Sequence, residues 1–156
     1  MKAVINRSHI EGILYEHALE LKVTGENSKN PGTPFITGTI SVATDNAGIN
    51  VVPVHFTYVT ATTKSGGANA TYNTLNNILN GAKSVTVDGK ENAVKVRADS
   101  AVALNEFYSS RTGKEELVSA RRNEGGFIHI ITDPLREDER DRATFETDML
   151  ITGTRD

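Results

Sequence analysis

The chain of 156 residues contains no cysteine and no tryptophan, and its net charge at neutral pH is only −3. The absence of cysteine excludes disulfide scaffolds, thiolate zinc sites and cysteine nucleophiles. It fits a reducing compartment, so we expect a cytoplasmic protein, located in the host cytoplasm if the protein is viral. No apolar run is long enough for a membrane span or resembles a secretory signal. With 37% hydrophobic residues, the chain can nevertheless fold around a sizeable core.

The small net charge conceals an uneven distribution. Residues 131–156 carry eight acids against four arginines, which leaves 13 of the 17 basic residues and 12 of the 20 acidic residues in residues 1–130. A nearly neutral body can bind a polyanion only through a local basic face, and such binding weakens strongly with salt. A histone-like, strongly basic coat protein is therefore not expected.

Alternation of apolar and polar residues predicts strands over most of the chain. The expected strands are 10–23, 35–43, 51–60, 84–87, 93–97, 101–109, 115–122, 126–131 and 143–152. Residues 70–80 are the best helix candidate, because apolar residues recur there at helical spacing and Gly81 supplies a stop. In the second strand, Gly38 removes a side chain from the apolar row, which indicates a point where the backbone bends or approaches a neighbour.

The order of three strands, one helix and further strands predicts the fold class. We expect an all-β protein with one short helix, organised as an OB-fold-like five-stranded Greek-key barrel with hairpin extensions. A β-sandwich with one helix would give a similar pattern. Residues 1–131 would form an OB-fold-like nucleic-acid-binding domain, and the charged loop and final strand of residues 132–156 would belong to the same domain.

The most informative segment is a polar hairpin over residues 105–130. It joins two strand-like runs through a turn that contains Thr112, Gly113 and Lys114. Aromatic residues lie close in sequence to cations in this hairpin. Such a combination on a sheet suits an unpaired nucleic-acid strand, because bases stack on aromatic rings and phosphates require positive charge.

Four segments of the chain carry a resemblance to a known family. They are Ile10-Glu-Gly-Ile13, Phe35-Ile-Thr-Gly-Thr-Ile40, the helix after Gly66-Gly67, and Asn105-Glu-Phe-Tyr108 with its hairpin. Together they resemble the OB-fold single-stranded-DNA-binding proteins of tailed bacteriophages over most of residues 10–131. The resemblance implies sequence-tolerant coating of single-stranded DNA, or of RNA, in replication or recombination. It also implies replication or recombination proteins, or a second copy of the chain, as partners. The chain departs from bacterial members in lacking tryptophan and a Gly/Pro-rich linker with an acidic tip.

Candidate binding residues are aromatic and basic side chains on these strands and loops. The stacking candidates are Phe35, Phe107, Tyr108 and Phe127, and the phosphate-binding candidates are Lys64, Lys95, Arg97, Arg111, Arg121 and Arg122. Because side chains alternate along a strand, Phe107 and Tyr108 should point to opposite faces, with one of them in the core. The same alternation places Phe56 and Tyr58 together in the core. Each cation alone could equally serve to keep a sheet edge soluble.

Other function classes receive little support from the sequence. The four histidines are isolated and have no metal-ligand spacing, so no metal or other cofactor is expected. The chain contains no nucleophile elbow, Walker loop or dinucleotide fingerprint, and we expect no enzymatic activity. The main alternative is a virion structural or assembly protein, such as a tail, neck or capsid-associated β-domain. A small regulator that binds a protein partner is a third hypothesis.

Overall fold

The computed structural model describes residues 4–149 and 153, and it is rich in β-structure, as the sequence predicts. The strands are β1 (Asn6–Val23), β2 (Pro34–Ala43), β3 (Val51–Thr60), β4 (Lys95–Ser109), β5 (Glu116–Ile131) and β6 (Ala143–Thr147). The helices are α1 (Ala70–Leu79) and the single turn α2 (Val85–Asp88), and a 3₁₀ turn, η1 (Glu139–Arg142), precedes β6.

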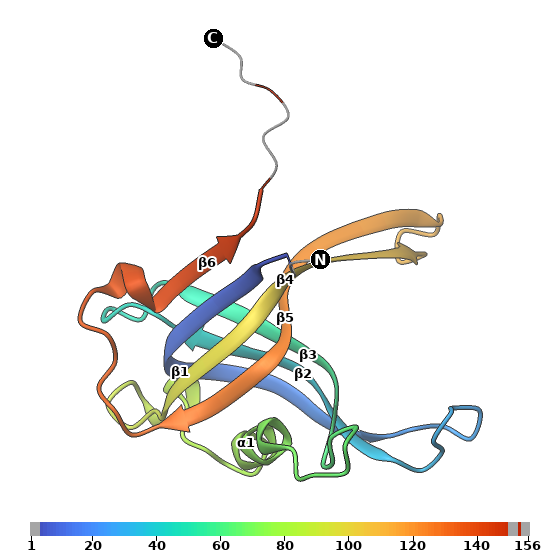
Figure 1. Ribbon diagram of the computed structural model, residues 1–156, viewed down its shortest axis with the longest axis horizontal. Coiled ribbons are helices and arrows are strands. Elements are labelled where there is room, and N and C mark those ends of the chain that lie inside the picture. The colour runs from blue at the N-terminus through green and yellow to red at the C-terminus, as the bar shows by residue number, and fades with distance from the viewer. Residues whose placement is uncertain (1–3, 150–152, 154–156) are drawn as a thin grey trace.

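The six strands form one sheet that closes on itself. The order is β2-β3-β5-β4-β1, β1 also pairs with β2, and β6 adds to β1 (Figure 1). All pairings are antiparallel except the short parallel contact between β3 and β5. Closure removes most of the free strand edges of the ring. The closed ring consists of five strands, β1 to β5, and β6 is a sixth strand that pairs with β1 outside the ring.

The long strand β1 pairs with three neighbours, and a register shift part-way along reverses which of its side chains point inward. Its first part pairs with β4 and β6, its second part pairs with β2, and the register shifts between Leu14 and Glu16. Such a bulge inserts one residue and reverses the alternation of side chains beyond it. Leu14 before the bulge and Leu19 after it are consequently both buried. The side chains of β1 therefore do not follow one unbroken alternation from Ile13 to Val23.

A second bulge overturns the expected position of Tyr58. In the pairing of β2 with β3, Ile36 lies opposite Val59 and Gly38 opposite Phe56, so β3 has one residue more than β2 at this point. Phe56 is buried as predicted, but Tyr58 is turned to the outer face, where 49% of it is exposed.

The core fills the ring, and α1 closes one end of it (Figure 1). Asn69 begins α1 as an N-cap, because its side chain accepts a hydrogen bond from the backbone N–H of Thr71. Leu75 and Ile78 on one face of α1 are fully buried. The strands contribute to this core cluster the side chains of Ile10, Leu14, Leu19, Ile36, Ile40, Val42, Val54, Phe56, Val96, Ala98 and Ile128.

The predicted element boundaries require several corrections. The run 84–87 is not a strand: Val85–Asp88 forms α2. The expected pairs of short strands at 93–109 and 115–131 are two long, continuous strands, β4 and β5, because a bulge near Ser100 interrupts the pattern without breaking the ladder. The last strand ends at Thr147. The remainder of the expected strand, through residue 152, lies largely outside the described residues.

Gly38 marks a close approach of two backbones, as the sequence predicts. A Cβ atom at Gly38 would lie 2.1 Å from the carbonyl oxygen of Ala18, and the φ angle of Gly38 is +128°. Only glycine fits where β1 and β2 cross so closely.

Two segments project beyond the ring on the same side (Figure 1). One is the loop 24–33 between β1 and β2. The other, which we call the arm, is the outer part of the β4–β5 hairpin, residues 103–122. Among the described residues, no helix is long and apolar enough to cross a membrane.

Candidate nucleic-acid interface

A groove of about 540 Å³ lies on the outer surface of the sheet where β3 meets β5. Its walls come from the end of β3, the loop 61–69 and the middle of β5. Its lining includes Thr57, Tyr58, Lys64, Glu124, Gly126 and Phe127. We call this feature the groove.

The loop that carries Lys64 is held in a defined shape. Thr62 and Ala68 form an isolated antiparallel bridge, and the backbone N–H of Thr63 donates to the carbonyl of Gly67 over 2.8 Å. At the base of the loop, the side-chain amide of Asn69 donates to the carbonyl of Thr60. Lys64 thus sits at the tip of a small hairpin beside the groove, rather than on a flexible linker.

Aromatic rings line and border the groove. Phe127 on β5 is 64% exposed, and Tyr58 on β3 is half-exposed. Behind Tyr58 lies Phe35 of β2, with the two ring centroids 4.7 Å apart and the planes tilted by 42°. Tilted contacts between aromatic rings are favourable, so Phe35 helps to hold the ring of Tyr58 in place. The groove thus offers two exposed rings on neighbouring strands.

Gly126 brings Phe127 to this surface. It lies in a bulge opposite Ser100, and a Cβ atom at Gly126 would meet the carbonyl oxygen of Asp99 at 1.7 Å. Its φ angle is +85°, in the region that favours glycine. The bulge lets both Glu124 and Phe127 face outward at the groove.

A polar cluster occupies the end of the groove nearest the arm. Glu124 accepts hydrogen bonds from the hydroxyl of Thr57 and, over 2.6 Å, from Nε of Arg122. Burial opposes the charge of Glu124, but these two hydrogen bonds and the positive charge of Arg122 lower its pKa below the ordinary value. The carboxylate is therefore ionised and paired at neutral pH.

His55 belongs to the same cluster. Its Nδ1 lies 3.0 Å from the hydroxyl of Thr39, and its backbone pairs with Glu124. Burial and the nearby positive charge of Arg122 lower the pKa of His55, and Glu124 offsets only part of that effect. A neutral imidazole here can exchange hydrogen bonds but adds no positive charge to the surface.

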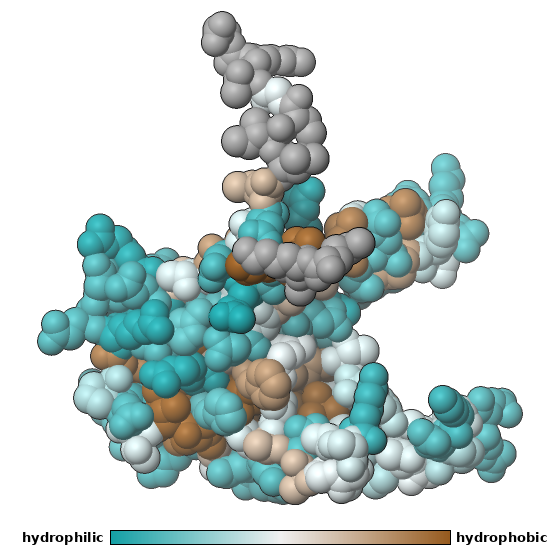
Figure 2. All heavy atoms as spheres, in the orientation of Figure 1, coloured by the Kyte–Doolittle hydropathy of each residue, from teal (hydrophilic) through white to brown (hydrophobic). Residues whose placement is uncertain are grey.

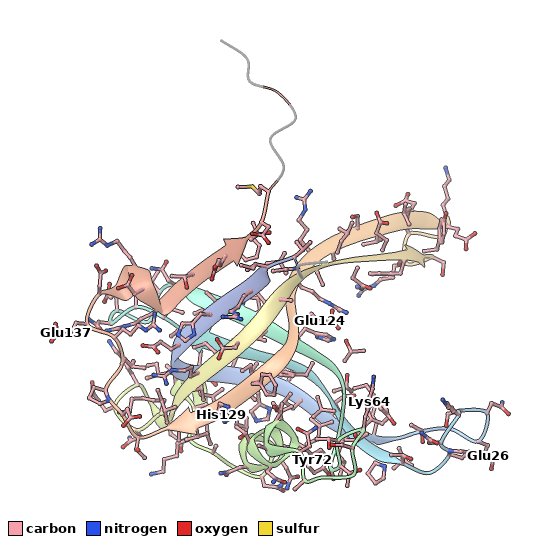
Figure 3. All side chains as sticks on the ribbon, in the orientation of Figure 1. Glu26, Lys64, Tyr72, Glu124, His129 and Glu137 are labelled. Atoms are coloured by element: carbon pink, nitrogen blue, oxygen red, sulfur yellow. The ribbon has the colours of Figure 1, made fainter. Side chains whose placement is uncertain are left out.

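The two projections flank the groove. Figure 2 shows the loop 24–33 and the arm extending from the body with a hollow between them. Figure 3 places Glu124 and Lys64 on the side from which the projections extend, whereas Glu137 lies at the far end of the molecule. A long, flexible ligand could therefore cross the groove between two protruding segments.

The arm carries five of the predicted binding residues, but on different faces. The register pairs Phe107 with Val118 and Tyr108 with Leu117, so Phe107 and Tyr108 do point to opposite faces. The expectation that one of them is buried is wrong: they are 45% and 69% exposed, because the arm extends beyond the core.

The cations of the arm are also divided. Arg121 is exposed and adjacent to Arg122, so their side chains lie on opposite faces. Arg122 is bound to Glu124 beside the groove, and Arg111 lies in the turn at the tip. Of the arm residues, Arg122 is the one that the structure joins directly to the groove cluster.

Two predicted cations, Lys95 and Arg97, lie elsewhere and are engaged within the chain. Nζ of Lys95 donates to the carbonyls of Thr132 and Asp133 at 2.9 and 2.7 Å. Nε of Arg97 donates to the carboxylate of Glu11 at 3.1 Å. We call this region, the outer face of β1 and β4 around Glu11, the covered side.

Glu11 is the centre of the covered side and is fully buried. Besides Arg97, its carboxylate accepts a 2.7 Å hydrogen bond from the backbone N–H of Arg136, and it lies 3.4 Å from Nε2 of His9. Burial alone would raise the pKa of Glu11, but the hydrogen bonds from Arg136, Arg97 and His9 outweigh it and lower the pKa.

Arg142 fastens residues 132–142, the segment that lies over the covered side, to the body. It is buried, and its guanidinium donates to the carbonyl of Arg136 at 2.6 Å, to the side-chain oxygen of Asn46 at 2.8 Å, and to the carbonyl of Thr44. These contacts satisfy a buried charge inside the chain. They leave it unavailable to an external ligand.

Thr57, Tyr58 and Glu124 line the groove but are not among the binding residues that the sequence predicts. Tyr58 lies in a period-two apolar run and looks like a core residue until the bulge is known. Glu124 lies within the informative hairpin, but nothing in the sequence indicates that a strand 67 residues earlier supplies its partner Thr57. The part of the chain that the structure describes contains no group of three or more acidic or histidine side chains placed to hold a metal ion.

The fold and the groove define a β-protein with a closed, six-stranded sheet and an open aromatic surface flanked by two projections. The YorF family model matches residues 5–156, and the chain belongs to this family. No curated protein matches the chain.

Proposed function

We propose that this YorF-family chain is a phage-encoded single-stranded-DNA-binding protein with an OB-fold, which coats single strands in replication or recombination without strong sequence preference. The observation that carries the proposal is the pair of exposed rings, Tyr58 and Phe127, beside Lys64 in the groove. Rings that are accessible on a rigid sheet can stack on any base, and this makes binding tolerant of sequence.

The topology supports the OB-fold. Three antiparallel strands are followed by α1, and the last two strands of the ring then return so that β5 lies beside β3 and β4 beside β1. OB-folds bind oligonucleotides on the face of the second and third strands, between the loop after the first strand and the loop between the last two. Here that region contains Phe35, Tyr58, the loop 24–33 and the arm.

The charge of the groove suggests how a strand would lie. Glu124 is ionised and would repel a phosphate placed directly over it, although Arg122 neutralises much of its charge. We therefore place bases against Tyr58 and Phe127, and phosphates near Lys64 and the cations of the arm. Affinity should be modest and sensitive to salt, because few cations are free on this side.

Fluorescence anisotropy with a labelled oligo-dT of about 16 nucleotides, the upper end of the site size of one OB-fold, tests the proposal. We expect saturable binding at low salt that weakens as salt is raised, and weaker binding to a duplex of the same length. Absence of binding at low salt, or binding that is insensitive to salt, would contradict it. An oligo-U of equal length compares RNA with DNA.

A virion structural or assembly role is the second candidate, and one observation favours it. The arm exposes large apolar side chains on both of its faces, as subunit contacts require. Size-exclusion chromatography with light scattering distinguishes the two candidates. Ring or tube assemblies without affinity for oligo-dT would favour the structural role.

A further inference from the structure

The arm is a two-stranded ribbon that leaves the ring without further support. The last β4 residue that pairs with β1 is Ser100, and β5 pairs with β3 only at Asn123 and Glu124. An isolated two-stranded ribbon is marginally stable in water and usually requires additional strands or a packed face. The arm nevertheless continues for a further seven cross-strand pairs, from Ala103 opposite Arg122 to Ser109 opposite Glu116.

Apolar side chains on the arm indicate that a partner completes it. Leu104, Phe107, Tyr108 and Leu117 are each about half or more exposed, and the register distributes them over both faces of the ribbon. Figure 2 shows apolar side chains along this projection. A ligand that stacks on one face would leave the other face in water. A ribbon that gains strands at its edge would give both faces new neighbours.

The two edges of the arm differ. On the β4 edge, the side chain of Asn6 exchanges two hydrogen bonds with the backbone of Val102, at 2.9 and 3.0 Å, and so closes the base of that edge. On the β5 edge, within the described residues, positions 116–122 pair with β4 alone. From Ala103 to Ser109 the β4 edge also pairs, among the described residues, with β5 alone, so the charges along the two edges decide which of them a second copy can join.

The charges along the β5 edge are self-complementary. Acidic Glu115 and Glu116 stand at the tip, and basic Arg121 and Arg122 stand at the base. If two such edges pair antiparallel about a two-fold axis at Val118, Glu115 of each chain lies opposite Arg121 of the other, and Lys114 lies in the turn beyond the paired strands. A parallel pairing would instead place like charges together.

We propose that the arm is a homodimerisation element: the β5 edges of two copies pair antiparallel and join two ribbons into one four-stranded sheet. The occupant is a second copy because the edge complements its own charge pattern. This inference does not rest on the proposed nucleic-acid binding. The dimer would place two grooves at opposite ends of a shared, continuous sheet.

A charge-swap experiment tests the pairing in the absence of nucleic acid. One variant carries Glu115→Lys, and the other carries Arg121→Glu, so that Arg122 and its bond to Glu124 are left intact. Each alone places like charges at both ends of the pairing, so we expect at least a tenfold weaker dimer and a monomer mass by light scattering at concentrations where the wild type is dimeric. An equimolar mixture restores opposite charges at both ends and should recover the dimer mass.

Glu106→Lys changes a charge on β4 and is the matched control, which should leave the dimer intact. Recovery in the mixture also shows that the variant arms still fold. The proposal would be overturned by a wild type that stays monomeric at every concentration. It would also be overturned by charge variants that dimerise as strongly as the wild type, or by a mixture that remains monomeric.

Discussion

The outer surface of this closed sheet has two sides that are both built from polar strands but differ in whether another segment of the chain covers them. On the covered side, Glu11 and Arg97 project from β1 and β4, and residues 132–142 run over them. On the groove side, Tyr58 and Phe127 project from β3 and β5, and no described segment crosses them. Both sides carry polar strands, but only the covered side has its charges enclosed beneath a returning segment of the chain.

The difference separates residues that stabilise the fold from residues that remain available to a ligand. A buried, ionised glutamate is costly unless hydrogen bonds offset its burial, and Glu11 has three partners for this purpose. Exposed rings contribute little to folding and are the side chains that a base can stack on. Mutations on the two sides should therefore affect different measurements.

The largest effect on stability is expected at Gly126 of β5, where its backbone approaches β4 closely. Gly126→Ala would place a Cβ atom against the carbonyl of Asp99, and we expect a loss of more than about 4 kcal/mol in the free energy of unfolding, since neither backbone can move without breaking the ladder. Chemical denaturation monitored by circular dichroism measures it. Gly125→Ala is the matched control: its φ angle is also positive, at +66°, but a Cβ atom there meets no atom within 4 Å, so about 1 kcal/mol is expected. Equal losses in the two variants would contradict the steric explanation.

Loss of the central carboxylate on the covered side should have the next largest effect. Glu11→Ala removes the partner of Arg97 and of the Arg136 backbone, and we expect a loss of about 3 kcal/mol in the free energy of unfolding. Glu20→Ala removes the carboxylate of an exposed ion pair with Lys22 on the same strand and should cost less than about 1 kcal/mol. Below the unfolding transition, neither variant should change affinity for oligo-dT. A loss of affinity in folded Glu11→Ala protein would place the binding surface on the covered side.

Removal of the aromatic rings in the groove should weaken binding of oligo-dT and leave the stability of the fold nearly unchanged. Tyr58→Ala and Phe127→Ala should each weaken oligo-dT binding by about 1–3 kcal/mol, because each ring supplies one stacking contact, with little change in stability. Phe145→Ala removes an exposed aromatic ring on β6, away from the groove, and should leave affinity unchanged. The anisotropy titration measures all three, and equal affinities for the three variants would remove the groove from the proposal.

The smallest effect is expected from the groove cation. Lys64→Ala should weaken binding several-fold at low salt and reduce the slope of log K against log salt by about one, as loss of one phosphate contact does. Lys95→Ala is its counterpart on the covered side, where the ammonium is bound to two carbonyls, and it should not alter the slope. An unchanged slope for Lys64→Ala would show that phosphates pass elsewhere.

Local sequence predicted much of the fold. Alternation located β2 and β3, helical spacing and Gly81 located α1, and the hairpin around Gly113 is the β4–β5 hairpin. These features depend on contacts between near neighbours or on the period of one element, and a single sequence contains both. The role of Gly38 was also predictable, because a glycine in an apolar row of a strand typically marks a bend or a close backbone approach.

The candidate site was only partly predictable. Phe127 and Lys64 line the groove and Phe35 supports it, but Lys95 and Arg97 are engaged on the covered side. Nothing local to Lys95 or Arg97 shows that residues 132–142 return to β1 and β4. Such long-range returns decide which of two similar polar strand faces is left open.

The sequence by itself determined the strand and helix periods, the uneven charge and the absence of cysteine chemistry. The tertiary structure alone decided where the alternation reverses, because the bulges near Tyr15, Tyr58 and Gly126 arise where strands must curve and change partners to close the ring. Those three shifts bury Leu19, turn Tyr58 outward and allow Glu124 and Phe127 to share one surface. A period-two pattern cannot reveal the bulges near Tyr15 and Tyr58, since the inserted residue has no local signature and its position is set by the partner strand. At the third bulge, Gly126 is the one local indication.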